Sequence, residues 1–159
     1  MHGKRFTGII ALLAAAVIAS GSAPAAGIQG LWRTMDDKTH QPRGVVRIYL
    51  DDDEYSGRIV SSFNPREAHE VCEPCSGPLH NQPIVGLQIL SGMREHDGEY
   101  SGGTIVDPDT GEVYRCKMTL ADDGRKLTVR AYVGLALFGR TQVWTRDAPP
   151  PGMRETGGR

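Results

Sequence analysis

The sequence predicts an all-β fold, a single antiparallel meander of about eight strands that closes or nearly closes into a β-barrel. Three observations carry this prediction. Apolar and polar residues alternate with a period of two in several segments, no long segment shows the 3.6-residue period of a helix, and the connections are mainly tight turns. Closing the meander removes exposed sheet edges, so a barrel is preferred to a two-sheet sandwich, which is the second choice.

The first three candidate strands cover residues 28–35, 45–50 and 54–60. Their alternation is that of a sheet with one buried face. The acidic run at 51–53 provides a turn that joins the second and third strands as a hairpin. Residues 61–83 break the alternation with four prolines and many polar residues. We expect a long loop there, which is uncommon in a compact domain unless it is functional or cross-linked.

Five further candidate strands follow this loop, and alternation again supports them. Gly102 and Gly103 permit a bend or a close backbone approach inside one of them. The Asp-Pro-Asp-Thr-Gly segment at 107–111 is a turn, because its proline presets φ and its glycine tolerates a positive φ. In the strand after that turn, Cys116 falls on the apolar face and is expected to point into the core. The five strands cover residues 84–90, 99–106, 112–120, 126–133 and 137–146.

The N-terminus is typical of a secretory signal peptide. Lys4 and Arg5 precede an uncharged apolar run over residues 6–18, and Ala23-Pro24-Ala25 resembles a processing site. We therefore predict a signal peptide over 1–26, a barrel domain over 27–147 and a disordered, proline- and glycine-rich tail over 148–159. Because no cysteine lies near the end of the apolar run to carry a lipid anchor, we expect a periplasmic or secreted protein without stable membrane insertion.

The charge balance argues against nucleic acid as a partner. The chain has 18 basic and 19 acidic residues, and loss of Lys4 and Arg5 would leave 16 basic residues and a formal charge of −3. Nucleic-acid binding requires a concentration of positive charge that this chain lacks.

Three cysteines follow the signal segment. Cys72 and Cys75 are expected to form a disulfide, because export implies an oxidising compartment. A zinc knuckle that adds His69 and His80, or a reducible redox pair, is a less favoured alternative. Cys116 is interpreted as a small apolar core residue.

No catalytic residue, metal ion or cofactor is predicted. The sequence contains no nucleophile elbow, no zinc-protease motif and no glycine-rich phosphate loop. The acidic runs at 51–54 and 107–112 lack the spacing of a calcium loop and are explained as hairpin turns.

Several segments together resemble one family, the exported bacterial proteins of the domain of unknown function 2147. The resemblance is carried by the opening Gly30–Thr34 segment, the Cys72-x-x-Cys75 pair, the mid-chain segments 102–108 and 114–116, and the C-terminal segments 130–134 and 138–146. It covers nearly the whole chain after the signal and implies little about activity.

A second resemblance concerns the fold. Lipocalin-like barrels open with Gly-x-Trp, whose indole closes the barrel floor beneath an arginine from a late strand. Gly30 and Trp32 are similar to this motif, and Arg140 is taken as the arginine, with Arg146 the other candidate. The resemblance implies a lipocalin-like barrel.

The working prediction is a non-catalytic barrel that binds a small apolar molecule or an envelope component. A side-chain-filled barrel that uses the 61–83 loop for protein contacts is the first alternative, and a thiol-redox or metal protein is the second. The oligomeric state is left open. The apolar segment 135–138 is expected to be mainly buried at a barrel bend. The alternative is that it lines the barrel mouth and touches a hydrophobic ligand or a membrane surface. The candidate ligand-lining residues are Tyr49, Tyr55, Tyr100, Leu137 and Phe138.

Overall fold

The computed structural model describes residues 27–36, 38–67 and 69–148. The predicted signal peptide, and the predicted tail apart from Ala148, lie outside the described residues. Among the described residues, no helix has the length and apolar character needed to cross a membrane.

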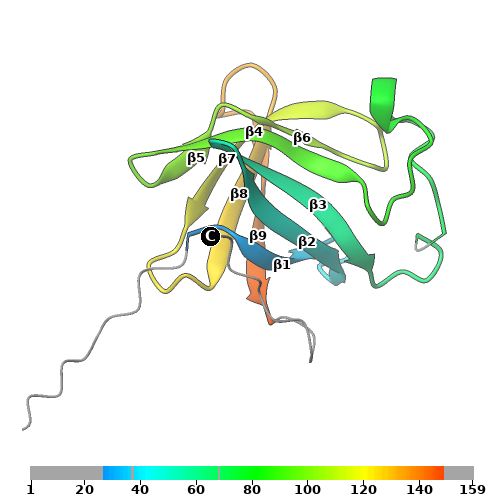
Figure 1. Cartoon of the computed structure of the whole chain (residues 1–159), viewed down its shortest axis with the longest axis horizontal. Helices are drawn as coiled ribbons and strands as arrows, with labels where there is room; N and C mark the ends of the chain where they lie inside the picture. The colour runs from blue at the N-terminus through cyan, green and yellow to red at the C-terminus, as the bar shows by residue number, and fades with distance from the viewer. Residues whose placement is uncertain (1–26, 37, 68, 149–159) are drawn as a thin grey trace, which may run out of the picture.

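The predicted all-β barrel is confirmed (Figure 1). Within the described residues the strands are β1 (Gly30–Met35), β2 (Pro42–Asp51), β3 (Glu54–Ser62), β4 (Gln88–His96), β5 (Glu99–Ser101), β6 (Thr104–Val106), β7 (Val113–Leu120), β8 (Lys126–Tyr132) and β9 (Gly139–Asp147), with one short 3₁₀ helix, η1 (Gly77–Leu79).

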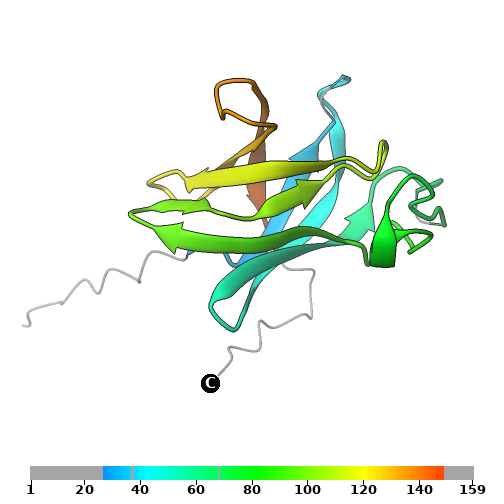
Figure 2. The same cartoon turned by 90° about the horizontal axis from the view of Figure 1, so that it is seen from above.

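All the strand pairings are antiparallel, and they close into a ring. β1 pairs with both β2 and β9, while β3 pairs with β4. β5 and β6 share one position between β4 and β7, so nine strands occupy the eight positions of the barrel. The described strands therefore form a closed ring with no open sheet edge. Figure 2 shows the same strands turned by 90°.

The predicted strand 99–106 is divided in the structure because Gly102 and Gly103 turn the chain within it. Gly102 has a φ of +85°. A Cβ on Gly103 would lie 2.2 Å from the carbonyl oxygen of Ser91, so only glycine allows the backbones to approach this closely. The result is a kink that brings β6, rather than an extension of β5, against β4 and β7.

The strand predicted at 84–90 begins later and ends later than expected, at Gln88 and His96. Ile84 and Leu87 are buried in the core without belonging to a strand. Gly86, with a φ of +109°, breaks the extended backbone between them. The apolar residues at these positions are buried, as the pattern predicted, but the strand begins at Gln88 and not at Ile84.

The barrel has two different ends. The chain termini of the described domain and the short turns β2–β3, β4–β5 and β7–β8 lie at one end, called here the floor. The connections β1–β2, β3–β4, β6–β7 and β8–β9 lie at the other, called here the mouth. Most fully buried side chains are near the floor or the middle of the barrel, and they include Trp32, Met93, Met118, Leu127 and Trp144.

Candidate functional site

The floor is closed by a tryptophan and an arginine. Trp32 is fully buried, and its Nε1 donates a hydrogen bond of 2.7 Å to the carbonyl of Ile28. The guanidinium carbon of Arg146 lies 4.3 Å from the centre of the Trp32 ring, a cation–π distance. The same guanidinium donates to the carbonyls of Gly27, Gln29 and Gly124 at 2.6–2.8 Å. These contacts tie the N-terminal segment, β9 and the β7–β8 turn together.

The prediction that Arg140 stacks on Trp32 is wrong. Arg140 and Arg146 both point inward from β9, but six residues separate them, about 20 Å along a strand. Arg140 therefore lies at the mouth, where it donates to Asp107 at 2.9 Å. Period-two alternation places both arginines on the inward face of β9, but it does not indicate which of them reaches the floor. Gly30, predicted in the floor motif, opens β1 with a φ of +125°.

Above the packed floor, the barrel contains a cavity of about 160 Å³. Its polar groups include Thr34 and Gln142. Gln142 accepts a hydrogen bond of 2.7 Å from the indole Nε1 of Trp144, so the indole nitrogen beside the cavity is satisfied. The walls are largely apolar and include Val46, Ile59, Ile84, Ile89, Ile105, Val106, Val129, Ala131 and Trp144.

Paired charges surround the opening of this cavity. Arg43 on β2 donates to both carboxylate oxygens of Asp109 and lies 3.5 Å from Glu67. Arg140 on β9 pairs with Asp107. The hydrogen bond to Asp109 raises the pKa of Arg43 above its ordinary value, so this guanidinium stays charged at every physiological pH. The two arginines lie on the strands that flank β1, and both hold the β6–β7 turn on the other side of the mouth.

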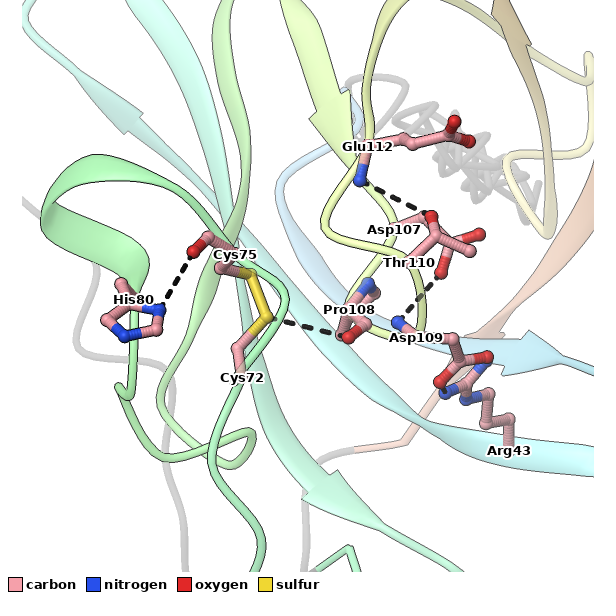
Figure 3. Close-up of a disulfide and its surroundings, with 9 residues drawn as sticks. All are labelled: Arg43, Cys72, Cys75, His80, Asp107, Pro108, Asp109, Thr110 and Glu112. Carbon is pink, nitrogen blue, oxygen red and sulfur yellow. Dashed lines mark hydrogen bonds and ion pairs between the residues drawn. A yellow bond between two sulfur atoms is a disulfide. The ribbon is translucent and has the colours of Figure 1, made fainter.

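The Cys72–Cys75 disulfide braces the same turn from outside the barrel (Figure 3). The Cys72 sulfur lies 3.5 Å from the carbonyl oxygen of Pro108. Since an oxidised sulfur carries no hydrogen, this is a packing contact and not a hydrogen bond. His80 lies with Nδ1 3.1 Å from the carbonyl oxygen of Cys75. The loop 61–83 is thus cross-linked and packed against the turn that borders the cavity.

The surroundings of Cys72 and Cys75 do not suit thiol exchange or zinc. Cys72 is 0% exposed and Cys75 is 4% exposed, so a thiol substrate has no route to either sulfur. No α-helix N-terminus lies beside them in the described part of the chain. Over the same residues, no three potential ligands gather as a metal site would require.

Cys116 points into the core, as predicted, and is 0% exposed. Burial raises the pKa of its thiol to about 12 from an ordinary value of 9.0. The buried thiol is therefore a poor nucleophile at neutral pH and serves to fill the core between β6 and β8.

This raised pKa predicts a specific loss of stability in alkali. Above pH 9 the unfolded chain releases the thiol proton while the folded chain retains it up to about pH 12. The free energy of unfolding of the wild-type protein should therefore fall between these values by about 1.4 kcal/mol per pH unit more than that of Cys116→Ala. Urea unfolding of both proteins from pH 8 to 11 measures this difference. Parallel pH profiles would contradict the assignment of a buried thiol.

None of the predicted ligand-lining residues lines the cavity inside the barrel. Tyr55 and Tyr100 come from the floor ends of β3 and β5 and contact each other edge to face, with ring centres 5.1 Å apart. Tyr49 contacts Gln88, with its hydroxyl 3.3 Å from Oε1. These residues were predicted from their aromatic character alone. A side chain lines the cavity only if it points inward from the mouth half of its strand.

Leu137 and Phe138 are not in the barrel interior either, and the expectation of a buried 135–138 segment is wrong. They lie in the β8–β9 connection, 78% and 73% exposed. The glycines at 134 and 139 allow the chain to leave the barrel wall, so its apolar side chains point outward. They border a second, shallow hollow, which shares Tyr114, Ala131 and Arg140 with the barrel cavity.

The fold and these segments agree with one known family. Residues 30–146 match the family described as "Uncharacterized protein conserved in bacteria (DUF2147)". The chain belongs to the DUF2147 family. No curated protein matches it. The family match confirms the predicted resemblance and includes the floor motif, the disulfide pair and the β6–β7 turn.

A solved structure supports the barrel. Protein HP1028 from the human pathogen Helicobacter pylori, described as belonging to the lipocalin family, is similar to this DUF2147 chain with a TM-score of 0.66 and 18% sequence identity. The similarity covers 76% of this chain and 83% of HP1028. At this level of identity the likeness shows a common fold and does not transfer a ligand.

Proposed function

We propose that this DUF2147 protein binds a small, largely apolar molecule in the mouth half of its barrel, in the periplasm or outside the cell, without transforming it. The apolar cavity of about 160 Å³ carries this proposal. The predicted signal peptide and the disulfide support the location.

The size of the cavity limits the ligand. A closed apolar cavity of roughly 150 Å³ is enough to hold benzene. The cavity of this barrel therefore suits a molecule, or the apolar end of a molecule, with roughly six to eight non-hydrogen atoms. A longer ligand would place its remaining atoms at the mouth, beside Arg43 and Arg140.

The cavity lining supports binding over catalysis. Its described residues include no histidine or cysteine. Four carboxylates border it, and each has a partner. Asp107 pairs with Arg140, Asp109 and Glu67 pair with Arg43, and Asp36 accepts hydrogen bonds from the Lys38 and Thr39 amides.

The first experiment is native mass spectrometry of protein exported to its own compartment and purified without detergent. A co-purifying small molecule that is released on denaturation is the expected result. The same preparation should have the mass of one disulfide and one free thiol, as Cys72, Cys75 and Cys116 require.

A matched pair of variants locates the binding. Ala131→Phe places a ring in the upper cavity, whereas Ala121→Phe makes the same change in the exposed β7–β8 turn at the floor. Ala131→Phe should reduce recovery of the co-purifying molecule, and benzene binding followed by NMR, by at least about tenfold. Ala121→Phe should bind as the wild type does. Equal binding by both variants, with thermal unfolding showing both folded, would exclude the cavity as the site.

An empty wild-type protein that also fails to bind benzene would contradict the proposal. The barrel would then be a scaffold, and the cross-linked 61–83 loop would be the surface to test for protein contacts.

A further inference from the structure

Large apolar side chains gather on the connection between β8 and β9, residues 133–138, called here the apolar loop. Leu135, Leu137 and Phe138 are 70–78% exposed, and Val133 is 68% exposed. In both views the apolar loop (orange) stands out from the barrel (Figures 1 and 2). Scattered exposed apolar residues are ordinary, but four within six positions at one projecting tip mark an interaction surface.

The backbone of the apolar loop is held in this shape by one arginine. Arg130 on β8 donates to the carbonyls of Ala136 and Leu137 at 2.5 and 2.9 Å, and to the Thr141 hydroxyl at 2.6 Å. The amide of Phe138 donates to the carbonyl of Leu135 at 3.1 Å. The tip therefore has part of its backbone hydrogen bonding satisfied internally, which lowers the cost of leaving water.

The barrel wall below the apolar loop is basic. Arg115 and Lys117 on β7 point outward beside Arg130, and the outward positions of β7, β8 and β9 in this half carry no carboxylate. Lys117 pairs with Glu99 of β5 at 3.0 Å. The carboxylate of Glu112, also near the mouth, accepts a hydrogen bond from the Tyr114 hydroxyl. An apolar tip above a basic wall is complementary to an anionic bilayer surface.

The shape favours a bilayer over a folded partner. A stable protein interface buries roughly 800 Å² on each side, more than a six-residue tip presents. A bilayer surface is fluid, so a narrow tip can enter it. The shallow hollow behind the tip shares Tyr114, Ala131 and Arg140 with the main cavity, so the tip leads directly to the cavity mouth.

We propose that the apolar loop inserts Leu135, Leu137 and Phe138 into the surface of an anionic bilayer, with the basic wall facing the lipid headgroups. Docking in this way places the cavity mouth at the membrane. Exchange of a ligand between the membrane and the cavity would depend on the proposed function, whereas docking itself does not.

Vesicle co-sedimentation with ligand-extracted protein tests the docking. Wild-type protein should bind vesicles made of equal parts of phosphatidylethanolamine and phosphatidylglycerol, and it should bind pure phosphatidylcholine vesicles less. Added salt should release the protein from the anionic vesicles. Leu137→Ser/Phe138→Ser should lower binding by at least about tenfold. Leu50→Ser changes a 45% exposed leucine at the floor end and should leave binding unchanged. Arg115→Gln should weaken the preference for anionic vesicles.

A second readout does not depend on loss of binding. Trp32 and Trp144 are 0% and 2% exposed, so brominated lipid should not quench the wild-type protein. Phe138→Trp should be quenched by brominated lipid, whereas Leu50→Trp should not. Equal quenching of the two variants, or wild-type protein that fails to bind anionic vesicles, would overturn the proposal. A concentration-dependent dimer that Leu137→Ser/Phe138→Ser abolishes would also overturn it, by assigning the loop to a second copy of the chain.

These measurements use no ligand. Vesicle binding can therefore be observed when the cavity binds nothing, and ligand binding can be observed when the protein does not bind vesicles. The two proposals are therefore tested separately.

Discussion

Trp32→Ala should lower the free energy of unfolding by about 3–5 kcal/mol, the cost of removing a large aromatic side chain from a packed core. Domains of this kind have a total stability of about 5–15 kcal/mol, so the variant is expected to be marginal. The loss has three parts: the buried indole, its hydrogen bond to Ile28 and its stacking under Arg146. Urea unfolding followed by circular dichroism measures it.

Trp32→Phe separates these parts. The phenyl ring retains most of the apolar volume but has no group that can donate to the Ile28 carbonyl, so we expect a loss of about 1–3 kcal/mol. If Trp32→Phe were as damaging as Trp32→Ala, packing would not be the main contribution of this side chain. If both were mild, the floor would not be a stabilising element of this barrel.

Gly111→Ala should have the second largest effect, about 2–5 kcal/mol. Gly111 has a φ of +72°, and a Cβ there would lie 2.0 Å from the carbonyl oxygen of Pro74, in the disulfide-linked loop. The substitution combines the cost of left-handed backbone for an L-residue with a steric clash that separates the β6–β7 turn from the 61–83 loop. Thermal unfolding and limited proteolysis of that loop report both consequences.

Gly124→Ala is the matched control for this prediction. Gly124 has a φ of +67°, but nothing lies within 4 Å of the position its Cβ would occupy. Only the backbone cost remains, about 1–2 kcal/mol. The difference between the two variants measures the contact between the turn and the loop. Equal effects would show that this contact contributes nothing to stability.

Much of the fold could be predicted from local sequence patterns, because each strand shows its own alternation. The hairpin at 51–53, the turn at 107–111 and the inward orientation of Cys116 required only neighbouring residues. The split at Gly102 and Gly103 was suggested by the glycines but depends on the close approach of Ser91, which lies on another strand. Long-range contacts of this kind have no local signal.

The candidate site was harder to predict than the fold. Alternation identifies inward faces, but it does not identify which half of the barrel is filled. Val46 and Val129 line the cavity while Met118 and Leu127 pack near the floor, although all four alternate in the same way. The choice between Arg140 and Arg146 had the same ambiguity. The outward orientation of Leu137 and Phe138 opposed the usual preference of apolar residues for burial, as interaction surfaces often do.

The division of the barrel into a packed floor and a hollow mouth also bears on how such a protein can change over generations. Side chains such as Ile59, Ile105 and Ala131 border the cavity, so replacing them alters the shape of the cavity and leaves the packed floor unchanged. The tryptophan and arginine of the floor maintain the architecture meanwhile. Related barrels can thus diverge in the molecules they accept while retaining one scaffold, and ligand selectivity becomes a trait that selection can adjust independently of thermal tolerance.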